Sequence, residues 1–177
     1  MLIYDALHKD HEVVRGLLNE LVALDYSDEN RHSGLIEQIR NELIPHSRAE
    51  EKIFYNSLRE MDTGKDVVMH GFQEHMEAEM TLRTLQLKDK IDADWKETAL
   101  KLKKAIEHHI QEEESKIFTV ARQVLTEQEA TQMADAFERM KPELRNEGFM
   151  KNTIEIIANL MPPRFKSSVK SDKDFRV

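Results

Sequence analysis

Hydrophobic residues recur every three or four positions through most of the chain, which is the spacing of amphipathic helices with one buried face. Turn-forming residues interrupt this pattern around residues 25–31, 62–64 and 89–94. The pattern therefore predicts four long helices, over about residues 2–24, 33–61, 65–88 and 95–125. Four amphipathic helices of similar length joined by short loops favour an all-α fold, an up-and-down antiparallel four-helix bundle.

The residues after the fourth helix have a different character. Thr126 and Glu129 have the spacing of a capping box, which predicts a shorter fifth helix that ends near Pro142. Residues 149–161 predict one more short helix on the bundle, and two prolines end it. Five basic and two acidic residues lie within 164–177 and predict a flexible tail. The predicted organisation is a bundle over 1–125, a helical extension over 126–163 and a tail over 164–177.

Composition makes several classes of protein unlikely candidates. The 177 residues include 34 acidic and 26 basic side chains, with a formal net charge of −8, and no cysteine. A negatively charged chain repels phosphate backbones and anionic lipids, so neither nucleic acid nor a membrane is an expected partner. The lack of cysteine excludes disulfides, thiolate zinc sites and iron–sulfur clusters. Because no apolar run reaches the roughly 18 residues of a membrane span, a cytoplasmic location is expected.

Histidines followed four residues later by glutamate are the most distinctive polar feature. Six of the eight histidines have this spacing, so the spacing alone selects nothing. The hydrophobic stripes do identify the inward-facing histidines, because the position of a residue relative to the apolar residues around it determines whether it lies on the buried face of the helix. The stripes place four histidines and their partner glutamates on inward faces: His11, His46 with Glu50, His75 with Glu79, and His109 with Glu113.

The four inward histidines are also expected at one depth in the bundle. In an up-and-down bundle, residues on successive helices are level when they are equidistant from the connecting loop. The midpoint between His11 and His46 lies in the first predicted loop, and that between His75 and His109 lies in the third. The midpoint of the middle pair falls within about two residues of the second loop. One layer of the core is therefore predicted to hold four imidazoles and at least two carboxylates.

A polar layer of this size is unstable unless something binds there. Each poorly paired buried polar group costs about 1–3 kcal/mol, and the total rivals the ~5–15 kcal/mol stability of a domain. A bound metal offsets this cost, and histidine with glutamate suits iron, manganese or zinc. Because Glu50 and Glu113 face each other and can bridge, two metals with about four protein ligands each are predicted. The alternative is a metal-free core in which these side chains satisfy one another.

Four stretches of the chain resemble the hemerythrin-like, or HHE cation-binding, domains. They are LHKDHEVVRGLL, IPHSRAEEKIFY, FQEHMEAEM and HHIQEEESKIF, and they lie between residues 7 and 118. The resemblance implies a non-haem centre of two iron ions, with an oxo or hydroxo bridge, that handles O2, nitric oxide, peroxide or iron itself. The ligands that it implies are His11, His46, Glu50, His75, His109 and Glu113.

One position departs from the oxygen-carrying members of that family. They have a second histidine one turn after the first on the third helix, where this chain has Glu79. A further carboxylate makes the site more anionic and favours the ferric state, which argues against reversible O2 storage. Glu79 is expected either to bind a metal directly or to accept a hydrogen bond from an imidazole.

The leading functional hypothesis is a diiron protein that binds or reduces a small oxidant, with a diatomic molecule or peroxide as its ligand. Enzymatic turnover of peroxide or nitric oxide is a second hypothesis, and Glu79 is the one acid–base residue that the sequence suggests for it. A third hypothesis is an iron donor, or an iron or redox sensor, that recognises a protein partner through the residues after 125.

Overall fold

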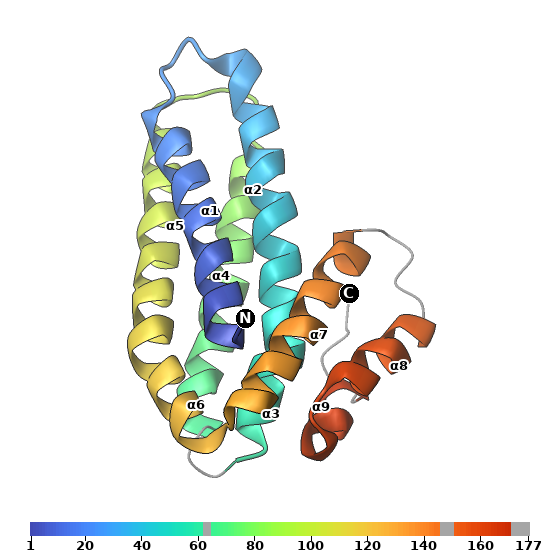
Figure 1. Ribbon diagram of the computed structural model, residues 1–177. Coiled ribbons are helices and arrows are strands. Elements are labelled where there is room, and N and C mark those ends of the chain that lie inside the picture. The colour runs from blue at the N-terminus through green and yellow to red at the C-terminus, as the bar shows by residue number, and fades with distance from the viewer. Residues whose placement is uncertain (62–64, 146–150, 171–177) are drawn as a thin grey trace.

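The computed structural model describes residues 1–61, 65–145 and 151–170, and these residues form helices and turns without any strand. The predicted all-α fold class is confirmed. The long helices of the bundle are α1 (Ile3–Ala23), α2 (Glu29–Glu50), α4 (Lys65–Gln86) and α5 (Ala93–Glu112). Figure 1 shows them side by side, and their contacts join α1 to α2, α2 to α4, α4 to α5 and α5 to α1. None of the described helices is long and apolar enough to cross a membrane.

Two of the long helices continue through short π-helical segments. The first, η1 (Glu51–Tyr55), follows α2 and leads into α3 (Asn56–Arg59). The second, η2 (Glu113–Ile117), follows α5 and leads into α6 (Phe118–Val124). The sequence predicts α-helix through both stretches, and π turns of this kind are frequent at functional sites. Here they begin directly after Glu50 and at Glu113, two of the predicted ligands.

The residues after α6 pack back on the bundle. α7 (Glu127–Arg145) contacts α1 and α2, and α8 (Lys151–Leu160) contacts α7. The predicted capping box is present, since the Thr126 N–H donates to Glu129 Oε2 at 2.8 Å and the Glu129 N–H donates to Thr126 Oγ1 at 3.3 Å. The predicted end near Pro142 is wrong. The helix continues to Arg145, whose guanidinium pairs with Glu42 of α2 at 2.6 Å.

The first part of the predicted flexible tail is helical. The 3₁₀ turn η3 (Pro163–Phe165) leads into α9 (Lys166–Lys170), and α9 contacts η1 and α3. Phe165 and Val169 are buried there, and the Ser168 hydroxyl lies 3.3 Å from that of Ser57. The tail prediction is therefore wrong for 164–170, because these side chains complete the core. Residues 171–177 of that tail, the predicted turn at 62–64 and residues 146–150 lie outside the described residues.

The interior consists of two apolar clusters with a polar layer between them. One cluster joins the bundle to the C-terminal helices, and its largest members are Phe54, Tyr55 and Phe137. The other lies toward the turns that join α1 to α2 and α4 to α5, and it contains Trp95. Along α1, Leu7 belongs to the first cluster and Val14 to the second, while His11 lies between them. The four inward histidines therefore occupy the boundary between the clusters, whereas His32 is buried against Trp95 in the second cluster.

Gly71 on α4 lies against the ring of Tyr55. A Cβ atom at this position would be 2.6 Å from Tyr55 Cε2 and 2.7 Å from the Tyr55 hydroxyl oxygen. We predict that Gly71→Ala lowers the free energy of unfolding by about 1–3 kcal/mol, because a fully buried ring must move in a packed core. Urea denaturation of the wild type and the variant measures this difference.

Gly16 in α1 provides the matched control, since a Cβ atom there meets nothing within 4 Å. Gly16→Ala is expected to raise the free energy of unfolding by about 0.5–1 kcal/mol through helix propensity alone. Equal effects of the two substitutions would contradict the role of the Gly71–Tyr55 contact.

Candidate metal centre

Six of the predicted site residues converge in the polar layer between the apolar clusters. All six are buried, with at most 7 % of each residue exposed. They come from every long helix of the bundle and from η2: His11 from α1, His46 and Glu50 from α2, His75 from α4, His109 from α5 and Glu113 from η2. The sequence-based placement of these side chains in one layer agrees with the structure.

One group of donor atoms consists of Glu50, His75 and His109. His75 Nε2 lies 3.3 Å from Glu50 Oε2 and 3.0 Å from His109 Nε2. One ligand atom of each residue lies within 4.8 Å of the other two, which is close enough for a single ion to bind all three. The Tyr55 ring stacks on His75 with the ring centroids 5.5 Å apart and helps to hold the imidazole in place.

A second group of donor atoms consists of His11, His46 and Glu113. His11 Nε2 lies 3.1 Å from Glu113 Oε2, and the two imidazole rings meet edge to face with centroids 5.1 Å apart. Glu50 joins the two groups, because its Oε2 also lies 3.6 Å from His46 Nε2. The layer thus contains two His–His–Glu sets that share a pair of buried carboxylates.

Each of these four histidines places its outer ring nitrogen on a carboxylate of a different helical segment. The Nδ1-to-oxygen distances are 2.9–3.2 Å, for His11 to Glu114, His46 to Asp10, His75 to Glu51 and His109 to Glu74. Because a carboxylate accepts hydrogen bonds, Nδ1 carries the proton, and Nε2 of the neutral imidazole presents its lone pair. The inner nitrogens are therefore oriented as metal ligands would be.

The outer carboxylates stand next to the predicted ligands in the sequence. Glu51 and Glu114 directly follow Glu50 and Glu113, and Asp10 and Glu74 directly precede His11 and His75. Their role was not predicted from the sequence. The signal that could have found it is this adjacency, because consecutive residues point about 100° apart around a helix. One acid of each pair can therefore face the centre while its neighbour reaches the next helix.

The two central glutamates have no hydrogen-bond donor in the part of the chain that the structure describes. All four carboxylate oxygens of Glu50 and Glu113 lack one, and both side chains are fully buried. An ionised carboxylate in such a place is strongly destabilising unless it is paired or bound to a metal. Four imidazole nitrogens and two carboxylates form a ligand set that fits iron, so the residues present fit a metal centre.

Protons occupy part of the centre when no metal is bound. Burial lowers the pKa of His46 to about 4, so that imidazole is neutral at pH 7. Burial also disfavours the charged form of His11, but the adjacent Glu113 and Glu114 carboxylates outweigh it and raise the pKa of His11 to about 9. Burial and the facing Glu113 carboxylate raise the pKa of Glu50. A cation that enters the centre therefore displaces protons.

A small cavity adjoins the four histidines on the side of the second apolar cluster. It encloses about 20 Å³, and aliphatic side chains of that cluster, among them Val14, Leu43 and Ile106, line it together with the imidazoles. A space of this size holds about one water-sized molecule. The cavity therefore suits a ligand of about two or three atoms and is too small for an organic substrate.

Glu79 does not take part in the centre. Its carboxylate oxygen lies 2.6 Å from Arg48 Nη2, and its side chain is 41 % exposed. The prediction that Glu79 points inward beside His75 is wrong. Glu79 directly follows the buried Ala78, and consecutive residues point about 100° apart around a helix, so Glu79 lies beside the buried face, where Arg48 pairs with it. The hypothesis that Glu79 binds a metal or acts as an acid–base residue loses its basis.

Comparison with known proteins is consistent with this geometry. The family model described as the hemerythrin HHE cation binding domain matches residues 2–121, which include all six buried site residues. A protein described as a DNA nickase, from Nostoc sp. strain PCC 7120, is 25 % identical over 145 residues. That alignment covers 82 % of this chain and 40 % of the nickase, so the chain spans about two fifths of its relative's length. No solved structure matches the chain.

The carboxylates on the outer nitrogens make the first prediction about metal affinity. We expect Glu114→Ala to weaken Co²⁺ binding by about 10- to 100-fold, because His11 loses the acceptor that orients its ring. Competition with a coloured chelator measures the change. Glu114→Gln keeps an acceptor oxygen and should recover part of the affinity.

Glu107 on α5 offers a matched control, since it pairs at the surface with Lys103 at 2.7 Å. Glu107→Ala removes a carboxylate from α5, the helix that leads into η2, and should leave the affinity unchanged. If Glu114→Ala binds Co²⁺ as tightly as Glu107→Ala does, the orienting role is refuted.

Proposed function

We propose that this chain, which belongs to the hemerythrin HHE cation-binding family, is a non-haem diiron protein that binds or reduces a small oxidant. The observation that carries the proposal is the pair of facing His–His–Glu sets around two buried carboxylates that have no donor among the described residues. Each set offers ligands to one ion, and Glu50 lies near histidines of both sets. Two bridged iron ions are the cofactor that this arrangement favours.

The chain's own residues have three tasks in this proposal. Bound iron supplies redox chemistry toward dioxygen, nitric oxide or peroxide. The imidazoles hold fixed positions because their outer nitrogens are hydrogen-bonded, and the apolar clusters exclude water from the layer. Six carboxylates balance the charge of the ions: Asp10, Glu50, Glu51, Glu74, Glu113 and Glu114.

The cavity beside the imidazoles supports a small ligand. Most of its lining is aliphatic or imidazole, with Ser47 and Glu74 as the other polar side chains, which suits dioxygen or nitric oxide better than a polar organic molecule. Its volume of about 20 Å³ fits the same size class. The location of the cavity next to all four inward histidines supports binding at the centre itself.

Tyr55 gives the enzymatic alternative a candidate proton donor in place of Glu79. Its ring stacks on His75, and its fully buried hydroxyl has no hydrogen-bond partner in the described part of the chain. Burial and the nearby Glu113 and Glu50 carboxylates raise the pKa of Tyr55, so the hydroxyl keeps its proton. Because the reduction of peroxide or nitric oxide consumes protons, this hydroxyl favours turnover as a second candidate function.

The iron-donor or sensor alternative requires a partner surface after residue 125. Phe137, Phe165 and Val169 are buried against the bundle, whereas Ile156 and Leu160 of α8 are exposed. Recognition of a protein partner through this extension stays a prediction.

DNA cleavage is not part of the proposal. The nickase from Nostoc has more than half of its length outside the alignment with this chain. The formal net charge of −8 also opposes binding to a phosphate backbone.

Anaerobic reconstitution with Fe²⁺ tests the proposal. We expect about two iron ions per chain and, after exposure to air, the near-ultraviolet absorption of an oxo-bridged ferric pair. Glu50→Leu should abolish this uptake and stabilise the metal-free protein by about 1–4 kcal/mol, because it removes a buried carboxylate without a partner. Fewer than about one iron ion per wild-type chain would refute the diiron centre.

Glu37 on α2 is the control for this substitution, since it is exposed and pairs with Arg40. Glu37→Leu changes the same residue type on the same helix and should leave iron uptake intact. Retained uptake in that variant shows that the loss in Glu50→Leu comes from the buried position.

The proton-donor role of Tyr55 has its own test. Tyr55→Phe should slow peroxide reduction by about 10-fold or more while the iron content stays the same. Tyr4→Phe is the control, because Tyr4 is also buried and its hydroxyl also lacks a partner in the described residues. Equal turnover in both variants would remove Tyr55 from the mechanism.

A further inference from the structure

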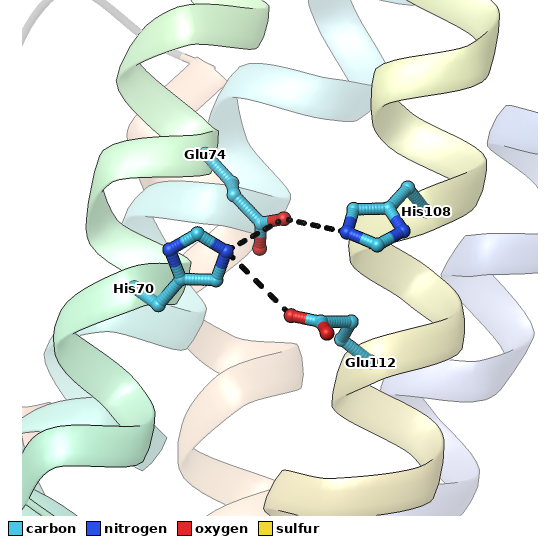
Figure 2. A group of neighbouring side chains, drawn as sticks. All are labelled: His70, Glu74, His108 and Glu112. Carbon is cyan, nitrogen blue, oxygen red and sulfur yellow. Dashed lines mark ion pairs between the residues drawn. The ribbon is translucent and has the colours of Figure 1, made fainter.

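Four more metal-binding side chains meet at the surface beside the buried centre. His70 and Glu74 lie one turn apart on α4, and His108 and Glu112 lie one turn apart on α5. Figure 2 shows that the four side chains point toward one another from the two helices. One ligand atom of each lies within 4.8 Å of the other three.

The separations between these atoms suit ligands of a common ion. His70 Nε2 lies 3.4 Å from Glu74 Oε1 and 3.6 Å from Glu112 Oε2. His108 Nε2 lies 3.9 Å from Glu74 Oε1. These distances exceed those of ordinary hydrogen bonds. Two ligands that bind one tetrahedral ion at about 2.0–2.2 Å are themselves about 3.4 Å apart. A small closing movement of exposed side chains would therefore complete the site.

The cluster is open to solvent and is partly held in place. The two histidine side chains are 57 % and 61 % exposed, so an ion can reach them without a change in the fold. The glutamate side chains are 14 % and 22 % exposed. Lys116 pairs with Glu112, so an incoming cation competes with one amine at this corner of the cluster.

Glu74 connects the surface cluster to the buried centre. Its Oε1 faces His70 and His108, while its Oε2 accepts a hydrogen bond from His109 Nδ1 at 2.9 Å. The corresponding carboxylate at His11, Glu114, also contacts an exposed histidine. Within the described residues, however, no comparable group of four surrounds Glu114. The α4–α5 side is therefore distinguished by a chelating cluster that shares a carboxylate with the centre.

A groove extends from the cluster along the surface of the bundle. It encloses about 260 Å³ and includes His70, Gly71 and Glu112 in its lining. Gly71 lies directly over the hydroxyl of Tyr55, whose ring stacks on His75. The groove thus adjoins the buried Gly71, where the wall over the buried centre has no side chain of its own.

We propose that His70, Glu74, His108 and Glu112 form a surface site for one divalent transition-metal ion, and that this site passes ions to the buried centre past Glu74. Mixed imidazole and carboxylate ligands suit Fe²⁺, Co²⁺, Zn²⁺ or Mn²⁺. Binding at the surface stands on these four residues alone, whereas transfer rests on the proposed function of the buried centre.

Anaerobic titration with Co²⁺ tests the surface site. We expect the wild type to bind about one Co²⁺ ion per chain more than the His70→Ala/His108→Ala variant, since the variant keeps only two carboxylates of the cluster. His8→Ala is the matched control, because His8 is also exposed and contacts Glu114, and this variant should bind as much Co²⁺ as the wild type. Equal binding by the wild type and the double variant would overturn the site.

The comparison separates this proposal from the diiron proposal. The wild type and the double variant have the same buried ligands, so the difference in Co²⁺ binding stands whether or not the buried centre takes up iron. If reconstitution with iron fails while the difference in Co²⁺ remains, the surface site is supported and the diiron centre is refuted.

The rate of iron uptake tests the transfer step. In stopped-flow measurements with Fe²⁺, the double variant should load the centre roughly 10-fold more slowly than the wild type, as expected when a local concentration of cations is lost. The final loading of the buried centre, measured by its near-ultraviolet absorption after exposure to air, should be the same. Equal loading rates in the wild type and the double variant would overturn transfer through this cluster.

Discussion

The structure depends on the hydrogen bond that each of the four imidazoles in the polar layer makes to a carboxylate of another helical segment. A polar layer inside an apolar core is destabilising unless its groups are paired or bound. The four bonds tie α1 to η2, α2 to α1, α4 to η1 and α5 to α4. They leave the oxygens of Glu50 and Glu113 at the centre without a donor among the described residues. The same layer that links the helices therefore favours the entry of cations.

The two halves of the layer are built from the same local sequence. Residues 46–51 and 109–114 both read H-x-x-x-E-E, and a π-helical segment begins at the end of each. The first glutamate of each pair faces the centre, and the second accepts from a histidine of another helix. This division explains why two consecutive acidic residues follow each histidine although one of them would suffice as a ligand. The same motif therefore supplies, in both halves of the layer, one carboxylate to the centre and one hydrogen-bond acceptor to a histidine of another helix.

Helix periodicity and loop positions were sufficient to place the four inward histidines, Glu50 and Glu113 in one layer, because both follow from backbone geometry. That these residues bind metal stays a prediction. Glu79 shows where periodicity stops being informative: at the edge of a helix face, Arg48 of the neighbouring helix determines the orientation. The tail prediction for residues 164–170 was wrong for a similar reason. Their basic composition predicts a flexible tail, whereas Phe165 is buried in the core. Tertiary contacts of this kind have no local signal.

Burial protects the proposed centre and at the same time restricts the entry of ions. The six side chains are at most 7 % exposed and the adjoining cavity encloses about 20 Å³, so an ion with its hydration shell does not fit. Water must be exchanged for protein ligands before or during entry, and this exchange is costly without ligands at the surface. A cluster that offers imidazole and carboxylate to a hydrated ion allows the exchange to proceed in steps. Because Glu74 contacts both His70 outside and His109 inside, it is the group best placed to connect those steps.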